Sequence, residues 1–429
     1  MNRINIAVLG LGTVGQGVVM LLDKQKEEIR KATGCEICLK RCLEKFKTKK
    51  LDVALAPGVL TDRWSEVVED PEIQIIIETI GGIEPARTYI IQALKAGKNV
   101  VTANKDLLAA CGQELFKAAA ENHRDLYYEA GVGGAIPLVG PLRQSLAASH
   151  LTEVIGIVNG TTNYILTRME REGRPFDDIL RDAMSLGYSE ADPSADIEGY
   201  DAARKMAILA TLAFHSQVTI ADVYVEGISR VDLEDIRSAR RLGYAVKLLG
   251  IARLDGELIE VRVHPALIPL AHPLASVHDN LNAILVNGED LGDSMFYGVG
   301  AGRLPSASAI LGDVAAIARN IKSGCEGRLN LLDRRERAIK PMQDVETRFF
   351  LRLVLADQPG VLAKITEALA NHGVSLARVL QTNLREGDAE LVFVTHSVRD
   401  GDMQLALAEI GRLAATKEIV TVLRVEGLE

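Results

Sequence analysis

Residues 4–18 read INIAVLGLGTVGQGV. The apolar, partly β-branched residues 4–9 predict a strand, and a helical pattern follows directly after a glycine-rich turn. Gly10, Gly12 and Gly15 form G-x-G-x-x-G in that turn, which lets the backbone approach a pyrophosphate closely and aims a helix N-terminus at it. In this strand-to-helix context the pattern predicts dinucleotide binding. The alternative is a tight turn that binds nothing.

Strands and helices alternate downstream of this turn. The apolar runs predict strands at residues 36–41, 73–80 and 99–103, and a helix at residues 85–98. Such alternation is typical of an α/β domain with a doubly wound parallel sheet of the Rossmann type. We therefore expect a nucleotide-binding domain over residues 1–135.

The rest of the chain divides into three parts. Residues 136–302 mix helical and extended patterns, which predicts a second, α+β domain. Residues 331–347 are charged and poor in apolar side chains, as expected of an interdomain linker. Residues 348–429 show the order strand, helix, strand, strand, helix, strand, which predicts a ferredoxin-like βαββαβ fold.

Composition narrows the class of protein. The 429 residues are 48% hydrophobic and 25% charged, with a formal net charge of -9, so we expect small-molecule partners and no nucleic acid. Five cysteines form no evident disulfide framework, and the N-terminus shows no secretory leader, which indicates a cytoplasmic protein. No apolar run reaches the 18 or more residues of a membrane span.

The segment after the second predicted strand bears on cofactor choice. An NAD site usually has an acidic residue there, whereas residues 39–50 read LKRCLEKFKTKK. This segment is basic and contains Arg41, Lys45, Lys47, Lys49 and Lys50. These side chains favour the 2′-phosphate of NADP, although NAD remains possible and a solvated basic face is the alternative.

Three cysteines in the second predicted strand invite a metal interpretation. Cys35, Cys38 and Cys42 include C-x-x-C, but strand alternation would put Cys35 on the face opposite the other two. No fourth ligand lies nearby in sequence. Ordinary cysteines of the sheet are therefore the favoured interpretation.

Two lysines occur in positions suited to chemistry. Lys105 follows the strand at residues 99–103, at the strand end where α/β sheets bind ligands. Asp201 and Lys205 share one face of a predicted helix, preceded by an acidic loop with Glu190, Asp192 and Asp196 that would attract a substrate ammonium group. The alternatives are a solvated lysine and an exposed ion pair.

Six segments of the chain together resemble homoserine dehydrogenases. They are GLGTVG, VVTANK, YEAGVGGAIP, VNGTTNYIL, GYSEADPSADIEGYDAARK and GVGAGRLPSASA. The resemblance covers essentially the whole chain. It implies reversible NAD(P)-dependent reduction of L-aspartate 4-semialdehyde to L-homoserine, on the path to threonine, isoleucine and methionine. It also implies that residues 136–302 bind substrate and form dimers, and that residues 303–330 complete the nucleotide domain.

The resemblance assigns roles to individual residues. Lys205 would exchange a proton with the reacting oxygen, Lys105 would lie beside cofactor and substrate, and Asp201 would orient the reacting centre. The implied substrate-binding residues are Glu190, Asn159, Gly160, Thr161 and Asp196. The implied cofactor-binding residues are Gly10, Gly12, Thr13, Val14, Gly15, Arg41, Lys105, Gly302 and Ser306.

Two further features follow from the resemblance alone. YEAGVGGAIP resembles a loop that binds a monovalent cation, Na⁺ or K⁺, here through Glu129, Val132, Gly134 and Ile136. The chain departs from the family's pattern at Cys42, where an aspartate is common, and at Ser306, where a threonine is expected. The first departure modestly favours NADP, and the second retains the hydroxyl.

The C-terminal LADQPGVLAKI resembles the opening of an ACT domain. Such domains bind amino acids at the turn after their first strand, here Asp357, Gly360 and Val361, so feedback inhibition by threonine is expected. We also expect a homodimer or homotetramer. The alternatives are a catalytically silent Rossmann/ACT sensor of amino acids and a different ACT-linked dehydrogenase.

Overall fold

The computed structural model describes residues 2–46, 48, 50–189, 192–329, 336–383 and 388–427. The chain forms two compact units, each assembled from separate stretches of sequence. The first comprises Met1–Leu151, Ala207–Ala221 and Asn287–Glu336, and the second comprises Thr152–Met206, Asp222–Val286 and Arg337–Glu429.

A parallel sheet forms the centre of the first unit. Its strands, in the order β3-β2-β1-β4-β5-β6, are β3 (Leu60–Thr61), β2 (Cys35–Leu43), β1 (Asn2–Leu9), β4 (Ile73–Glu78), β5 (Asn99–Thr102) and β6 (Leu126–Tyr127). All neighbouring strands are parallel. This is the strand order of a dinucleotide-binding sheet, and the predicted doubly wound fold is confirmed.

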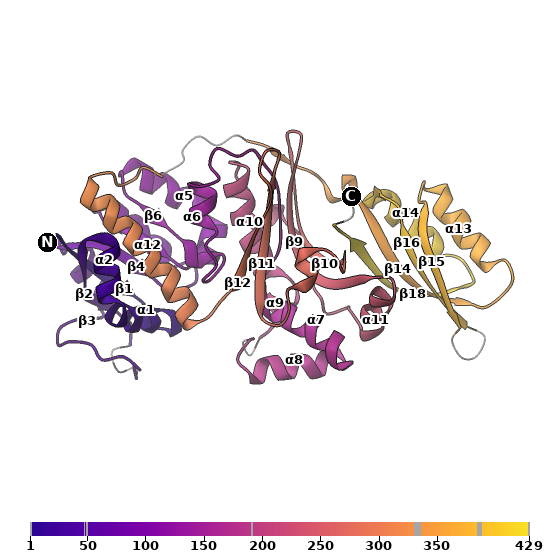
Figure 1. Cartoon of the computed structure of the whole chain (residues 1–429), viewed down its shortest axis with the longest axis horizontal. Coiled ribbons are helices and arrows are strands. Elements are labelled where there is room, and N and C mark those ends of the chain that lie inside the picture. The colour runs from indigo at the N-terminus through magenta and orange to yellow at the C-terminus, as the bar shows by residue number, and fades with distance from the viewer. Residues whose placement is uncertain are drawn as a thin grey trace. The chain divides into compact units, whose positions relative to one another are not determined.

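Helices cover this sheet, and one of them comes from much later in the chain. The unit contains α1 (Thr13–Lys24), α2 (Lys26–Thr33), α3 (Ser65–Val68), α4 (Ala86–Lys95), α5 (Lys105–Glu121), α6 (Val139–Arg143), α12 (Arg303–Ser323) and the strand β12 (Gly292–Val299). In Figure 1 the orange α12 lies beside the indigo α1. A Cβ on Gly17 would lie 2.6 Å from the Arg303 carbonyl oxygen, so this close packing requires glycine.

The cysteine prediction for β2 is correct for Cys38 and wrong for Cys42. The register of β2 against β1 shifts between Ile6 and Ala7, so that Cys42 returns to the face of Cys35. Cys35 and Cys42 are both buried in the same apolar cluster, whereas Cys38 is half-buried. Because burial raises the pKa of Cys42 to about 12, this thiol is inert packing.

The second unit is built on a largely antiparallel sheet. Its main path is β11 (Leu281–Gly288), β7 (Leu151–Ile157), β9 (Tyr244–Asp255), β10 (Leu258–Pro269), β18 (Thr416–Val425), β14 (Glu346–Ala356), β16 (Asp388–Thr395) and β15 (Leu376–Asn383). The short strands are β8 (Tyr224–Val225), β13 (Ala338–Ile339) and β17 (Val398–Arg399). Its helices are α7 (Gly160–Glu172), α8 (Phe176–Ser185), α9 (Ser194–Ile197), α10 (Tyr200–Ala213), α11 (Leu233–Arg241), α13 (Val361–Asn371) and α14 (Asp400–Ile410), of which α10 continues into the first unit.

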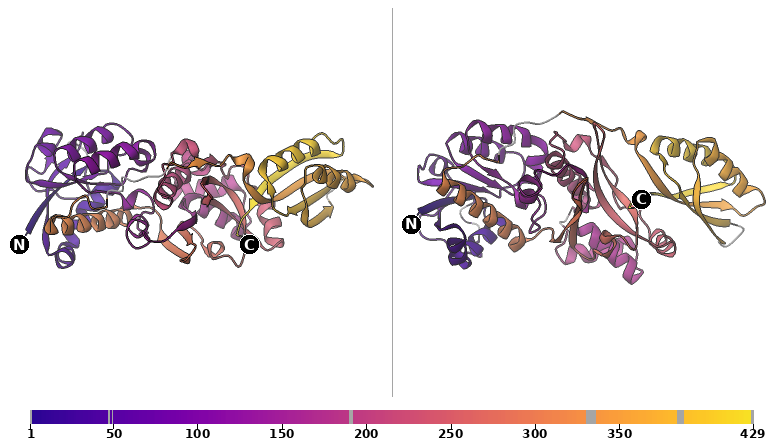
Figure 2. Two further views of the ribbon diagram at one scale, coloured as in Figure 1. Left: turned by 90° about the horizontal axis from the view of Figure 1, so that it is seen from above. Right: turned by 45° about the horizontal axis from the view of Figure 1, so that its top comes forward.

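The C-terminal part of this unit has the predicted βαββαβ order. Its elements follow as β14, α13, β15, β16, α14 and β18, with the minor strand β17 before α14. Phe349, Leu351 and Phe393 of the sheet are buried against Ile365 of α13 and Ile410 of α14. Figure 2 shows both helices on one face of the yellow sheet. The ferredoxin-like prediction is confirmed.

One short strand contact joins this part to the rest of the second unit. β18 pairs in parallel with β10 at Ala266↔Arg424 and Leu267↔Val425. Beside this contact, Arg352 of β14 donates through Nε to Oδ1 of Asp235 on α11 at 2.8 Å. Charged side chains are therefore buried near the place where the βαββαβ part joins the rest of this sheet.

Candidate active site

The glycine-rich turn between β1 and α1 has no room for a side chain at Gly10 or Gly15. Gly10 has φ +86°, and its N–H donates to the Leu43 carbonyl at 2.9 Å. A Cβ on Gly15 would lie 2.0 Å from the Gly10 carbonyl oxygen. Gly12, which precedes α1, has no described atom within 4 Å of its Cβ position. Exposed backbone and a helix N-terminus thus meet, as a pyrophosphate requires.

Lys105 lies at the carboxyl end of β5, as predicted. It opens α5, whose N-cap Asn104 accepts from the Leu107 N–H at 3.1 Å. On the neighbouring strand, the carboxyl group of Glu78 is completely buried and accepts from the Thr102 hydroxyl at 2.5 Å. Burial raises the pKa of Glu78 above its ordinary value. Lys105 itself is half-buried at this edge of the sheet.

Asp201 and Lys205 form a buried pair on α10. The Lys205 Nζ lies 2.7 Å from Oδ2 of Asp201, and their side chains are 9% and 10% exposed. The same Nζ donates to the Val158 carbonyl at 2.7 Å. The alternative of an exposed ion pair is therefore wrong. An ammonium group has three donors, and these two contacts leave one for a further acceptor.

Asn159 joins this pair to the preceding acidic loop. Its Nδ2 donates to Oδ1 of Asp196 at 2.7 Å and to Oδ2 of Asp201 at 2.9 Å. Its Oδ1 accepts from the Thr162 N–H at 2.9 Å, which caps α7. One amide therefore starts a helix and holds two carboxylates, and the structure brings Asn159, Asp196, Asp201 and Lys205 together.

The beginning of α7 packs tightly against its surroundings. A Cβ on Gly160 would lie 2.7 Å from the Asn280 carbonyl oxygen, so only glycine fits. The Thr161 hydroxyl donates to the Tyr188 carbonyl at 2.6 Å, which ties α7 to the start of the acidic loop. Glu190, predicted to bind a substrate ammonium group, lies outside the described residues.

Three family models match consecutive parts of the chain. Residues 10–129 match the homoserine dehydrogenase NAD-binding domain, residues 137–315 match homoserine dehydrogenase, and residues 349–415 match the ACT domain. The chain is 43% identical to a homoserine dehydrogenase of Bacillus subtilis, covering 100% of this chain and 99% of that one. The chain belongs to the homoserine dehydrogenase family.

Relatives and solved structures of this family agree over the full length. A Synechocystis homoserine dehydrogenase is 46% identical, covering 98% of this chain and 99% of the relative. The crystal structure of a homoserine dehydrogenase from Thiobacillus denitrificans is 42% identical with a TM-score of 0.93, covering 99% of each chain. The chain is thus an oxidoreductase that acts on a CH–OH group with NAD(P).

A more distant structure bears on the cofactor. A hyperthermophilic archaeal homoserine dehydrogenase in complex with NADPH is 27% identical with a TM-score of 0.63, covering 75% of this chain and 98% of that one. The C-terminal ACT domain is in keeping with allosteric regulation. Among the described helices of this chain, none is long and apolar enough to cross a membrane.

Glu44 is a candidate cofactor residue that the sequence prediction missed. It directly follows β2, and its Oε2 accepts from the Leu11 N–H of the glycine-rich turn at 3.0 Å. Its side chain is buried, and Oε1 accepts from the Phe46 N–H at 3.4 Å. In dinucleotide-binding folds an acidic group at the end of the second strand faces the adenosine ribose. Glu44 is part of the segment LKRCLEKFKTKK, but the interpretation of that segment rested on its basic residues and did not consider Glu44 as a cofactor residue.

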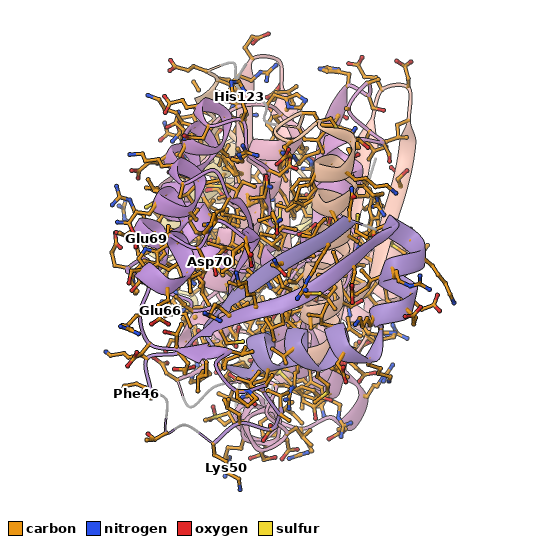
Figure 3. The ribbon with its side chains drawn as sticks, turned by 90° about the vertical axis from the view of Figure 1, so that its left-hand side faces the viewer. Phe46, Lys50, Glu66, Glu69, Asp70 and His123 are labelled. Carbon is orange, nitrogen blue, oxygen red and sulfur yellow. The ribbon has the colours of Figure 1, made fainter. Side chains whose placement is uncertain are left out.

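Arg41 and the lysines after β2 form a partly exposed basic segment. Nη1 of Arg41 donates to the carbonyls of Lys40 and Gly58 at 3.1 Å each, which holds the guanidinium beside the strand. Figure 3 shows Phe46 and Lys50 at the outer rim of this unit. The predicted partners Lys47 and Lys49 lie outside the described residues.

The loop around Glu129 presents oxygens of two kinds. The carboxylate accepts from the N–H groups of Leu138, Val139 at 2.7 Å and Gly140 at 2.8 Å. The carbonyls of Val132, Gly134 and Ile136 accept no hydrogen bond from any described residue.

Carbonyl and carboxylate oxygens on one loop are the kind of ligand that suits a monovalent cation, although the Glu129 carboxylate already accepts from three N–H groups. The described residues contain no cluster of three or more His, Cys, Asp or Glu side chains suited to other metals.

Asp313 on α12 is hydrogen-bonded to the backbone at the start of this loop. Its Oδ2 accepts from the Glu129 N–H at 2.9 Å. Burial, together with the charge of Glu129, raises the pKa of Asp313 well above its ordinary value. A second carboxyl group, whose charged form is disfavoured, therefore lies next to Glu129. No sequence pattern indicated this, because the two residues are far apart in the chain.

The remaining predicted residues occupy turns and helix starts. Gly302 precedes α12 with φ +137°, and its carbonyl accepts from the Ser306 N–H at 3.0 Å. In the ACT domain, Asp357 lies in the exposed turn after β14, and Gly360, with φ +85°, is the N-cap of α13, which begins at Val361. These positions agree with the expected places, and their roles remain predictions.

Proposed function

We propose that this chain reduces L-aspartate 4-semialdehyde reversibly to L-homoserine, with Lys205 transferring the proton. The observation that carries the proposal is the buried cluster of Lys205, Asp201 and Asn159. It holds the Lys205 ammonium group in place and leaves one of its three donors for a substrate oxygen. Negative charge develops on the carbonyl oxygen as the aldehyde is reduced. A fixed ammonium group stabilises that charge and donates the proton.

The other residues of the site orient the Lys205 ammonium group and the substrate. Asp201 holds the Lys205 ammonium, and Asn159 holds Asp201 and Asp196. We assign Glu190 to the substrate ammonium group, with Gly160 and Thr161 lining the pocket. Lys105 provides a second positive charge near cofactor and substrate. In the oxidative direction Lys205 accepts a proton, so homoserine oxidation should become faster as pH rises from 6 to 10.

The glycine-rich turn fits a nicotinamide dinucleotide, which supplies the hydride when bound. Gly10, Gly12 and Gly15 leave the backbone open to the pyrophosphate, with Thr13 and Val14 at the start of α1. We propose that Arg41 favours NADP, and that Glu44 keeps NAD usable because a carboxylate disfavours a 2′-phosphate. Gly302 and Ser306 complete the proposed cofactor residues.

A monovalent cation, Na⁺ or K⁺, is proposed at the loop with Glu129. The carbonyls of Val132, Gly134 and Ile136 and the Glu129 carboxylate would hold it. A cation there neutralises the carboxylate and stiffens the loop between β6 and α6. Measuring thermal stability in K⁺, Na⁺ and tetramethylammonium salts tests this, since the last ion is too large to bind carbonyls closely.

We further propose regulation by threonine at Asp357, Gly360 and Val361, in a cytoplasmic homodimer or homotetramer. Residues 1–135 with 303–330 would form the nucleotide domain, residues 136–302 the substrate and dimerisation domain, and residues 348–429 the ACT domain. Residues 331–347 would link the last two. Inhibition requires that threonine binds one conformation better than another.

The deciding experiment follows nicotinamide absorbance with homoserine and either NADP or NAD, with and without threonine. Turnover that threonine suppresses supports the whole proposal, and turnover without suppression supports the enzyme alone. Folded protein without turnover on either cofactor would contradict the proposed activity and favour an amino-acid sensor.

A further inference from the structure

A buried carboxyl group at the carboxyl end of β4 has no part in the proposed proton transfer. Glu78 is the last residue of β4, and in the register of the parallel sheet it lies between Leu9 of β1 and Thr102 of β5. Its side chain is completely buried. Burying a carboxyl group costs free energy unless hydrogen bonds offset that cost. The partners of its two oxygens therefore show what the group does.

One oxygen of Glu78 holds the turn that follows β4. Its Oε1 accepts from the Ile80 N–H at 2.7 Å and from the Gly81 N–H at 3.2 Å. Gly81 and Gly82 have φ values of +81° and +68°, which residues other than glycine rarely adopt. The carboxyl group thus fixes an unusual turn at the edge of the sheet where ligands of α/β folds bind.

The turn after β4 contacts the glycine-rich turn through Thr79. The Thr79 N–H donates to the Leu9 carbonyl at 2.9 Å, and its hydroxyl donates to the Gly10 carbonyl at 2.8 Å. A Cβ on Gly15 would lie 2.8 Å from Oγ1 of Thr79, so the two turns are closely packed. A displacement of the turn after β4 would therefore displace the backbone that is expected to hold the pyrophosphate.

The other oxygen of Glu78 is connected to the start of α5. Its Oε2 accepts from the Thr102 hydroxyl at 2.5 Å, and the oxygen of that hydroxyl accepts from the Asn104 N–H at 3.1 Å. Nδ2 of Asn104 donates to the Gly82 carbonyl at 2.6 Å, in the turn after β4. Asn104 is the N-cap of α5 and directly precedes Lys105. A closed chain of hydrogen bonds thus joins Glu78, the turn after β4 and the residue before Lys105.

We propose that Glu78 is a positioning residue that fixes the Lys105 ammonium group and the glycine-rich turn relative to each other. This inference rests on the proposed place of Lys105 beside cofactor and substrate. β4 lies between β1 and β5, so a carboxyl group at its end can bind to the segments that follow both neighbours. A group displaced by about 1 Å from its productive position can lower the rate by about 10²-fold. Glu78 therefore acts on the reaction through Lys105 and the turns.

The test is a double-mutant cycle on kcat for homoserine, measured at saturating cofactor. Glu78→Gln keeps the shape of the side chain but has a single acceptor oxygen, so it cannot serve both the turn and Thr102. It should lower kcat by about tenfold or more in the unchanged chain, and by less than about threefold in a chain that carries Lys105→Met. A residue that only stabilises the fold would lower kcat by the same factor in both chains.

Thr102→Val separates the two connections of Glu78. It removes the hydroxyl between Glu78 and Asn104 and leaves the bonds to the turn after β4. It should therefore lower kcat without changing the dissociation constant of NADPH, measured from nicotinamide fluorescence. Glu78→Gln should raise that dissociation constant by about fivefold, because it also loosens the turn. If Glu78→Gln does not fold, the same cycle with Thr102→Val decides.

Asp125→Asn is the matched control, because Asp125 is another buried carboxyl group of the same sheet. It directly precedes β6, at the opposite end of the strands, and accepts from the Gly327 N–H at 2.9 Å and from Nδ2 of Asn320 at 2.8 Å. Whatever this substitution does to stability in urea denaturation, it should leave kcat and NADPH binding unchanged.

Two results would overturn the role of Glu78. They are equal losses of kcat in the two chains of the cycle, and a normal kcat in Thr102→Val. An unchanged chain that binds NADPH but does not oxidise homoserine would instead overturn the proposed function. In that case the NADPH dissociation constants of Glu78→Gln and Thr102→Val still decide whether Glu78 holds the cofactor turn.

Discussion

Lys205 with Asp201 and Arg262 with Glu426 are both buried ion pairs of the second unit, but their surroundings differ. Among the described residues, Lys205 has two acceptors, Asp201 and the Val158 carbonyl, for three donors. Arg262 is completely buried and is enclosed by Glu426 at 2.6 Å, Glu260 at 2.7 Å and the ring of His264. Both cations keep a donor without a hydrogen-bond partner among the described residues, since Nη2 of Arg262 also has none. The difference therefore lies in the neighbours: Lys205 adjoins Asp201, which Asn159 joins to Asp196, whereas Arg262 lies at the contact of β10 with β18.

His264 contacts Arg262, and the pKa values of His264 and Glu426 reflect how deeply this group of residues is buried. Burial, with the charges of Arg262 and Arg424, lowers the pKa of His264 well below its ordinary value. Burial would raise the pKa of Glu426, but Arg262 and Arg253 outweigh it and hold that pKa at about 2. The surroundings therefore favour the charged form of Glu426 and disfavour the charged form of His264. Its location at the contact of β10 with β18 indicates that it holds the ACT domain in place.

The largest expected effect is on catalysis, at the Lys205–Asp201 pair. Lys205→Met should lower kcat for homoserine by about 10²- to 10⁴-fold, because general acid–base catalysis and the stabilising charge are both lost. Cofactor affinity should change little. The matched control is Lys247→Met, another buried lysine, which within the described residues donates to Oδ1 of Asn163 at 3.0 Å and to the Val277 carbonyl. It should lose stability and retain turnover, and equal kinetic losses in both variants would refute the distinction.

The next largest effect is on folding stability, at the Arg262–Glu426 pair. Glu426→Gln removes one of the two carboxylates beside the buried Arg262 and also the partner of Arg253 at 3.1 Å, which should cost about 3–5 kcal/mol in urea denaturation at pH 7. Since the folded pKa lies below the unfolded value, the stabilisation from Glu426 is present above about pH 4.5 and is lost as pH falls toward 2. The variant should lack that part of the acid dependence. A stability difference that stayed constant from pH 7 to 3 would contradict this account.

A smaller effect is expected at Glu44, the buried carboxylate proposed to lie beside the adenosine ribose of the cofactor. Glu44→Gln keeps an acceptor for the Leu11 N–H but removes the negative charge near the expected 2′-position. The ratio of kcat/KM with NADP to that with NAD should rise about fivefold, which corresponds to about 1 kcal/mol. Cys42→Ser is the control, because Cys42 is buried nearby without polar contact to the turn. An unchanged ratio would remove Glu44 from the cofactor site.

The smallest effect concerns Asp313, a buried carboxyl group that accepts from the Glu129 N–H at 2.9 Å. Its raised folded pKa means that the native state binds more protons than the unfolded state, so stability falls as pH rises above about 4. Asp313→Asn keeps an acceptor for the Glu129 N–H and removes this dependence. We expect a modest gain in stability at pH 8 and none at pH 4, measured by urea denaturation. The reverse order would show that Asp313 is charged in the folded protein.

Local patterns predicted most of the elements. The strand before Gly10 and the helix after Gly15 follow from neighbouring residues, since the turn between them needs glycine whatever surrounds it. The order of strands and helices in residues 348–429 likewise follows from hydrophobic periodicity. Cys42 was misplaced because the bulge opposite Ile6 and Ala7 depends on how β2 pairs with β1, and one residue of slip moves a side chain to the other face.

The sequence by itself determined the dinucleotide-binding turn, the ACT fold and the spacing that puts Asp201 and Lys205 on one helix face. These depend on residues close together in the chain. Only the tertiary structure decided that this pair is buried, that Asn159 joins Asp201 to Asp196, and that Arg262 is enclosed by Glu426. Arg262 and Glu426 are far apart in sequence, and the free energy of a charge depends on burial and on partners that folding alone brings near.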